Sequence, residues 1–89
     1  MALSLRRDQA AKTIAAYAGF LTGQVCSSLT RIIVTKSRHD ALVEALSAAF
    51  SKVKVGDPYD PTTGMGPLAM SRQRDRVEGY IEKGKAEGA

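Results

Sequence analysis

Apolar residues follow two different patterns along the chain, and each pattern predicts a different element. From Asp8 to Leu21 they return every three or four positions, which predicts a helix with one buried face. Asp8 is a residue type that caps helix N-termini, and Gly19 weakens the other end before Thr22 and Gly23 turn the chain. We expect this helix to serve packing.

The stretch Thr30 to Thr35 has another pattern, because it is almost entirely β-branched. Such a run is typical of a strand that is covered on both faces. A strand also needs a neighbour for its hydrogen bonds, and the other predicted elements are helices and a loop. We therefore expect a strand whose partners lie outside these 89 residues.

Two further helices and a loop are predicted after this strand. Ser37-Arg38-His39-Asp40 has the pattern of a capping box, and the helix behind it has an apolar stripe of Leu42, Val43, Leu46, Ala49, Phe50 and Val53. Gly56 to Pro67 holds three prolines and three glycines, which predicts an ordered loop without regular structure. Ser71 is expected to cap a third helix that ends near Gly88.

Composition and charge narrow the class of protein. With 44% hydrophobic and 25% charged residues, the chain is of ordinary globular type and is one small domain or a piece of one. Its net charge of +4 comes from basic residues interspersed with acidic ones, so a basic nucleic-acid-binding module is a minor alternative. No zinc-ligand set, secretory signal or membrane span is visible, and with a single cysteine this predicts a cytoplasmic protein.

The segment Gly23-Gln24-Val25-Cys26-Ser27-Ser28 carries the only cysteine, between the predicted helix and the predicted strand. A thiol in a loop of small and polar residues is a candidate nucleophile, although a lone cysteine is also a common small core residue. Together with Arg31 and the strand behind it, this loop resembles the nucleophile region of the aldehyde dehydrogenase superfamily. In that family a Gly-Gln-x-Cys loop is followed by a small residue, then Arg and a β-strand.

Three later motifs stand in the order that the family has: Gly56-Asp57-Pro58, then Thr63-Gly64-Met65-Gly66-Pro67-Leu68, then Gln73 with Gly79-Tyr80-Ile81. The resemblance is continuous from about Ala10 to Ala89. It implies an α/β fold, as a fragment of the aldehyde dehydrogenase catalytic domain that runs helix, Cys loop, strand, helix, loop, helix. Residues 1–89 would then be a partial catalytic domain, and the dinucleotide-binding domain would be absent.

The resemblance implies that Cys26 is the catalytic nucleophile of an NAD(P)-dependent aldehyde dehydrogenase. The thiolate would attack an aldehyde, the hemithioacetal would pass hydride to NAD or NADP, and water would hydrolyse the thioester to a carboxylic acid. Gln73 falls where the family often has a glutamine near the nicotinamide ribose, and Arg76 falls where a lysine often follows it. Alternatively, both are ordinary exposed polar residues. The sequence chooses neither between NAD and NADP nor among aldehydes.

Two parts of the family's catalytic machinery have no counterpart in this sequence. The general base, a glutamate in a Glu-Leu-Gly-Gly-Lys-type motif, and an asparagine that would hold the oxyanion together with the Cys26 N–H both lie upstream in the family. We therefore expect a fragment that is inactive alone and has negligible affinity for the dinucleotide. The alternative is a non-catalytic packing or interaction module that associates through an exposed edge of the Thr30–Thr35 strand.

Overall fold

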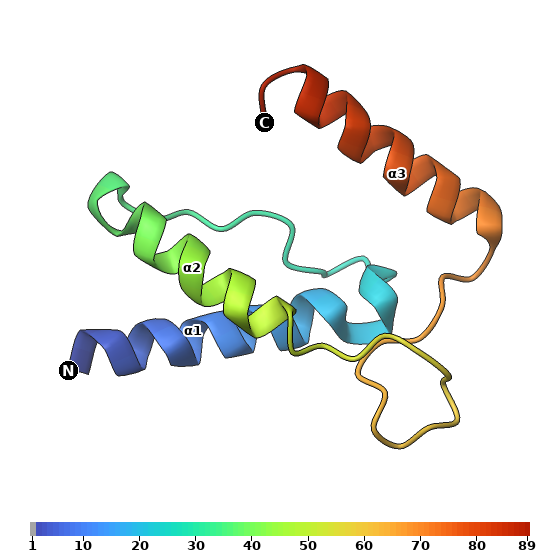
Figure 1. Ribbon diagram of the computed structural model, residues 1–89, viewed down its shortest axis with the longest axis horizontal. Helices are drawn as coiled ribbons and strands as arrows, with labels where there is room; N and C mark the ends of the chain where they lie inside the picture. The colour runs from blue at the N-terminus through green and yellow to red at the C-terminus, as the bar shows by residue number, and fades with distance from the viewer. Residues whose placement is uncertain (1) are drawn as a thin grey trace.

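Three α-helices and two short 3-10 helices make up the regular structure of the described residues. The computed structural model describes residues 2–89, with the side chains of residues 6–89. Its helices are α1 (Ala2–Gly19), α2 (His39–Phe50) and α3 (Ser71–Ala86), and its short 3-10 helices are η1 (Phe20–Gly23) and η2 (Lys36–Arg38). As Figure 1 shows, α1 and α2 lie against each other while α3 stands apart from both.

The contact between α1 and α2 forms the core. Ala11 and Ala15 on α1 are buried, with 1% and 5% of their surface exposed, and they are the only buried hydrophobic residues among residues 6–89. Their small side chains allow α2 to approach closely, and Leu42 and Leu46 of α2 are half-buried. The first helix is therefore confirmed, although Asp8 lies inside it rather than at its N-cap.

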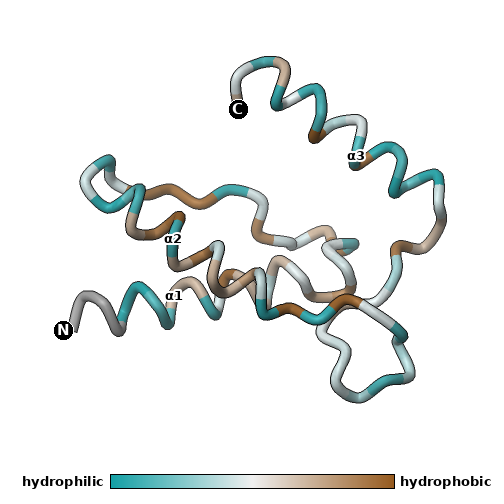
Figure 2. Tube along the Cα trace, in the orientation of Figure 1, coloured by the Kyte–Doolittle hydropathy of each residue, from teal (hydrophilic) through white to brown (hydrophobic). Residues whose placement is uncertain are grey.

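The predicted strand at Thr30–Thr35 is not formed in the described chain, so the structure shows the helices of the predicted α/β fragment and not its strand. This segment runs as irregular chain past α2, and it is one of the most hydrophobic stretches of the trace (Figure 2). Ile33 is 99% exposed. A strand is held by a ladder of hydrogen bonds to a neighbour, and the described residues hold only one isolated bridge, between Val55 and Met65.

The predicted side-chain caps of the later helices are also wrong. Ser37 belongs to η2, so α2 begins at His39 with Arg38 before it and has no side-chain cap. The Asp40 carboxylate hydrogen-bonds the His39 ring at 2.9 Å and makes no capping-box bond to the backbone among the described residues. Ser71 is the first residue of α3 instead of its cap.

The predicted irregular loop at Gly56–Pro67 is confirmed, and it is closed by its own hydrogen bonds. Gly64 N–H donates to Lys54 O at 2.8 Å, and Gly56 N–H donates to the main chain of the other arm at 3.1 Å. Lys54 Nζ lies 2.7 Å from Asp60 Oδ2. The Lys54 ammonium, with the N–H and hydroxyl of Thr62, lowers the pKa of the Asp60 carboxyl.

The molecule is less compact than a typical globular protein of its length. Its radius of gyration is 14.7 Å, whereas a compact chain of this length has about 12 Å. Its exposed surface is 7553 Å², against roughly 5,000 Å² for a compact protein of this mass. Helix α3 contributes to this surface, because it packs against no other described helix and exposes Val77, Tyr80 and Ile81.

Candidate nucleophile loop

Cys26 is presented to solvent on a tight turn. Ser28 N–H donates to Val25 O at 3.1 Å and closes a turn with Cys26 at its second position. Ser28 Oγ also donates to Gly23 O at 3.3 Å, which holds the two ends of the loop together. The cysteine is exposed and unpaired. The interpretation of this cysteine as a small core residue is therefore wrong for the chain as described.

The backbone just before this turn is left-handed over three consecutive residues. Leu21, Thr22 and Gly23 have φ of 47°, 60° and 72°. Residues with a Cβ pay roughly 1–2 kcal/mol for this conformation, so Leu21 and Thr22 store conformational energy. Glycine suits the third position because a side chain at the φ of Gly23 would be strained, although a Cβ there would make only an ordinary contact, 3.5 Å from Ala18 O. Such strain is common beside functional groups.

Two hydrogen bonds tie the cysteine loop to a segment more than forty residues away in sequence. Thr22 Oγ1 donates to Gly66 O at 3.0 Å. Ala69 N–H donates to Gln24 Oε1, also at 3.0 Å. We call Thr22, Gln24, Gly66 and Ala69 the clamp. The sequence motifs at residues 23–28 and 63–68 are thus neighbours in space, and the glutamine of the first motif is one of the residues that connect them.

The amide of Gln24 uses both its ends. While Oε1 accepts from Ala69, Nε2 donates to Leu21 O at 3.2 Å. Gln24 therefore bridges the left-handed turn and the distant segment at once. This role was missed by sequence reasoning, which used Gln24 only as part of a motif; its position between a turn and a cysteine gave no signal of a partner so far along the chain.

A depression of about 640 Å³ lies between the cysteine loop and the segment that the clamp holds. Its walls include Leu21, Thr22 and Gln24 on one side and Pro58, Met65 and Pro67 on the other. Cys26 is not among the lining residues. The depression follows from the clamp, and the thiol lies outside it on the turn.

Gln73 and Arg76 are held apart from this loop. Both lie in the first turns of α3, where Gln73 is half-buried and Arg76 is exposed, and no hydrogen bond or ion pair among the described residues links either side chain to the cysteine loop. None of α1, α2 and α3 begins at a glycine, so none offers the Gly-rich turn that cradles a dinucleotide pyrophosphate. The described residues therefore build no pyrophosphate cradle of this kind by themselves.

Other chemistry receives little support from residues 2–89. They contain no group of three or more His, Cys, Asp or Glu side chains that could bind a metal ion. In the same part of the chain, no helix combines the length and the apolar character that crossing a membrane requires. The lone histidine, His39, is exposed, and its Nδ1 lies 2.9 Å from Asp40 Oδ1. Cys26 remains the candidate reactive group.

Comparison with known proteins gives the family. Residues 4–89 match the model of the aldehyde dehydrogenase family, which extends the resemblance further toward the N-terminus than the motifs did. The betaine aldehyde dehydrogenases of Brucella ovis and Brucella anthropi are 50% and 53% identical over 70 residues. These residues are 79% of this chain and 14% of each relative, so the chain spans a small part of their length. The chain belongs to the aldehyde dehydrogenase family.

Proposed function

We propose that this chain carries the nucleophile of an aldehyde dehydrogenase, and that Cys26 is that nucleophile when the chain is part of a longer protein. Members of the family oxidise aldehydes and generally use NAD(P). The observation that carries the proposal is the exposed Cys26 on a turn joined by the clamp to the family motif at Thr63–Leu68. Residues 1–89 would form part of the catalytic domain, without the dinucleotide-binding domain.

The chemistry assigned to this chain is the first covalent step. The Cys26 thiolate adds to the aldehyde carbon, a C–S bond forms, and the carbonyl π electrons move to oxygen as an alkoxide. The Cys26 N–H would donate to this oxyanion. A free thiol is only a few per cent ionised at neutral pH, so fast addition needs a base to take the proton. No side chain among the described residues hydrogen-bonds Cys26, so we propose that the base comes from outside these 89 residues.

The structure of Thr30–Thr35 would also change in the longer protein. We propose that this segment becomes a strand when a sheet neighbour is available, because its β-branched residues favour extended backbone and Ile33 is almost wholly exposed in the described chain. We propose likewise that α3 then packs so that Gln73 and Arg76 face the cofactor. Protection of the Ile33 amide from exchange in the longer protein, but not in the 89-residue chain, is the expected result.

A graft tests the role of Cys26. The matching segment of the Brucella anthropi betaine aldehyde dehydrogenase is replaced by this chain, and NAD(P)H formation is followed with betaine aldehyde, a simple aliphatic aldehyde and an aromatic one. Cys26→Ala should lower kcat by roughly 10⁴-fold or more, because removing a covalent nucleophile disables the whole mechanism. Ser27→Ala, on the same turn, is the matched control and should keep activity. A Cys26→Ala graft as active as the Ser27→Ala graft contradicts the proposal.

By itself, the 89-residue chain should oxidise none of these aldehydes. The reason is that neither a base for Cys26 nor a dinucleotide site is built by its own residues. The same absorbance assay checks this expectation. Turnover by the isolated chain that disappears in Cys26→Ala would overturn it.

A second candidate function is that of an interaction module, and the exposure of Ile33 favours it. An unpaired β-branched segment can pair with another chain through its free N–H and C=O groups. Light scattering after size exclusion should then find dimers or larger species, and Ile33→Lys should shift the chain toward monomer. A monomer at every concentration would count against this function.

A further inference from the structure

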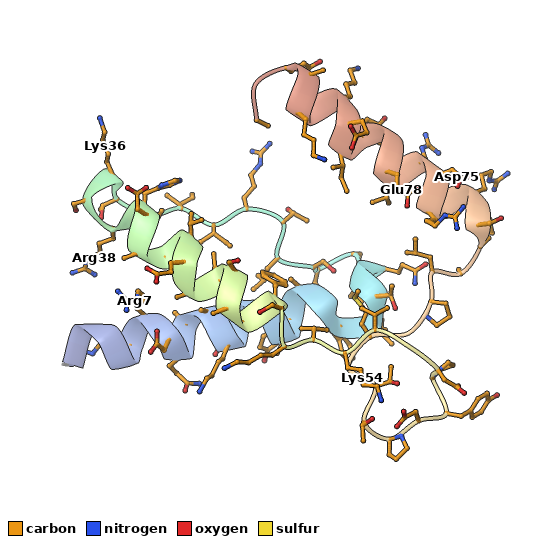
Figure 3. The ribbon with its side chains drawn as sticks, in the orientation of Figure 1. Arg7, Lys36, Arg38, Lys54, Asp75 and Glu78 are labelled. Atoms are coloured by element: carbon orange, nitrogen blue, oxygen red, sulfur yellow. The ribbon has the colours of Figure 1, made fainter. Side chains whose placement is uncertain are left out.

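The open end of the α1–α2 pair holds a basic cleft that the proposed function does not use. It has a volume of about 440 Å³. Its walls carry Arg6, Arg7 and Arg38, and its floor is apolar, with Ala10, Val34 and Leu42. Figure 3 shows Arg7 reaching up from α1 and Arg38 reaching down from η2, just before α2, toward the same gap.

The positive charge of this cleft is poorly compensated. No acidic residue lines it. Asp8 is the nearest acid in sequence, and its Oδ1 lies 3.7 Å from Arg7 Nε, at the long end of an ion pair. Asp40, in the first turn of α2, is fully exposed and hydrogen-bonds His39 instead. Arginines that face one gap without an acid repel each other, and an anion between them would remove this repulsion.

Two separate features also call for an acceptor at this place. The Arg7 guanidinium has one acid near it, Asp8, whose Oδ1 lies beyond hydrogen-bond distance of Nε, so Arg7 retains capacity to donate to an acceptor. In addition, α2 begins at the cleft without a side-chain cap, and although the His39 N–H donates to Lys36 O, the positive end of the helix dipole lies at the cleft. An anionic ligand would interact favourably with both features.

We propose that the cleft binds the carboxylate of a small apolar acid, with the carboxylate between Arg7 and Arg38 and the apolar tail on Val34 and Leu42. Planar guanidinium groups match carboxylate oxygens with paired, charge-assisted hydrogen bonds. Phosphate sites commonly use a nest of backbone N–H groups, often with glycine, and no glycine lines this cleft. The proposal is independent of the role of Cys26, and it concerns the 89-residue chain with Thr30–Thr35 in the described conformation, because Val34 belongs to that segment.

Calorimetric titration of the 89-residue chain with octanoate tests the proposal. Saturable binding that weakens with added salt is expected, and amide shifts in the NMR spectrum should centre on Ser37, Ala41 and Leu42. Arg7→Gln and Arg38→Gln should each weaken binding by about tenfold, because each removes a charge-assisted hydrogen bond. Arg74→Gln on α3 removes an equal charge away from the cleft and should leave the affinity unchanged.

Other results would overturn the proposal. Absence of saturable octanoate binding is one. Equal weakening by Arg74→Gln and Arg38→Gln is another, since it would mean that net charge and not this cleft attracts the anion. If inorganic phosphate bound as tightly as octanoate, the apolar floor would contribute nothing to binding. If 1-octanol bound as tightly as octanoate, the arginines would contribute nothing. Circular dichroism of each variant confirms that its helices are kept.

Discussion

The clamp should hold the cysteine loop in place, and removing both of its side-chain groups tests this directly. The double variant Thr22→Ala with Gln24→Ala deletes the hydroxyl that donates to Gly66 O and the amide oxygen that accepts from Ala69 N–H, the two bonds that cross to the distant segment. It also deletes the local bond from Gln24 Nε2 to Leu21 O. Neither substitution touches Cys26 or the buried alanines at the α1–α2 contact. The variant therefore separates the position of the loop from the fold of the helices.

The size of the effect follows from the two bonds. An intramolecular hydrogen bond contributes about 0.5–1.5 kcal/mol net. The Thr22 bond is half-buried and the Gln24 bond is exposed, so the lower part of this range applies to each. Together they stabilise the closed loop by roughly 1–2 kcal/mol, which is about a 5- to 30-fold change in the ratio of closed to open loop.

Amide hydrogen exchange measures this ratio. Protection of the Ala69 amide should fall by roughly 5- to 30-fold in the double variant, because Gln24 Oε1 is its acceptor. Thr22→Ser keeps a hydroxyl and should keep most of the protection. Ser51→Ala deletes a similar exposed bond, from Ser51 Oγ to Ala48 O at 3.0 Å, and should leave Ala69 unchanged. Equal Ala69 exchange rates in the parent chain and the double variant would refute the clamp.

Three further predictions concern stability. The lowered pKa of Asp60 means that the ionised carboxylate stabilises its loop. This stabilisation is complete above the ordinary pKa of 3.8 and is lost as the pH falls through the lowered pKa. An NMR titration should therefore find a midpoint below 3.8 for this carboxyl. Ala15→Leu should destabilise the helix pair by about 1–3 kcal/mol in thermal unfolding, whereas Ala16→Leu on the exposed side should not. Gly23→Ala should lower the free energy of unfolding by about 1–2 kcal/mol, because of the positive φ at this position. Gly79→Ala in α3, where the space for a Cβ is open, should raise the free energy of unfolding by about 0.5–1 kcal/mol. If Gly23→Ala were instead the more stable of the two variants, the left-handed turn would not be retained in solution.

The helices could be predicted from the sequence because their signal is local. Alanines and leucines at helical spacing mark the contact face of α1 and α2, and the proline- and glycine-rich run at Gly56–Pro67 marks a loop. The first residue of each helix was harder to predict. Asp40, for example, could hydrogen-bond either a helix N-terminus or the adjacent histidine, and in the structure it hydrogen-bonds His39. Competition between such local partners is not visible in a spacing pattern.

The parts that depend on distant residues could not be predicted in the same way. The β-branched run at Thr30–Thr35 indicates a preference for extended backbone, but a strand also needs a partner, and the described residues supply none. The bond between Ala69 and Gln24 joins residues 45 positions apart, and only the course of the intervening chain brings them together. The candidate nucleophile was identified from its motif, whereas the clamp that positions its loop required the structure.

The uncovered surface of α3 has a consequence for how this chain would respond to urea. The dependence of unfolding free energy on denaturant concentration, the m value, is proportional to the area that unfolding exposes. With 7553 Å² already exposed when folded, the chain has roughly 70% of the area change of a compact protein of equal mass. Its m value should be lower in the same proportion and its transition broader. Any partner that covers α3 would steepen the curve, so the slope itself reports whether that helix has found its neighbours.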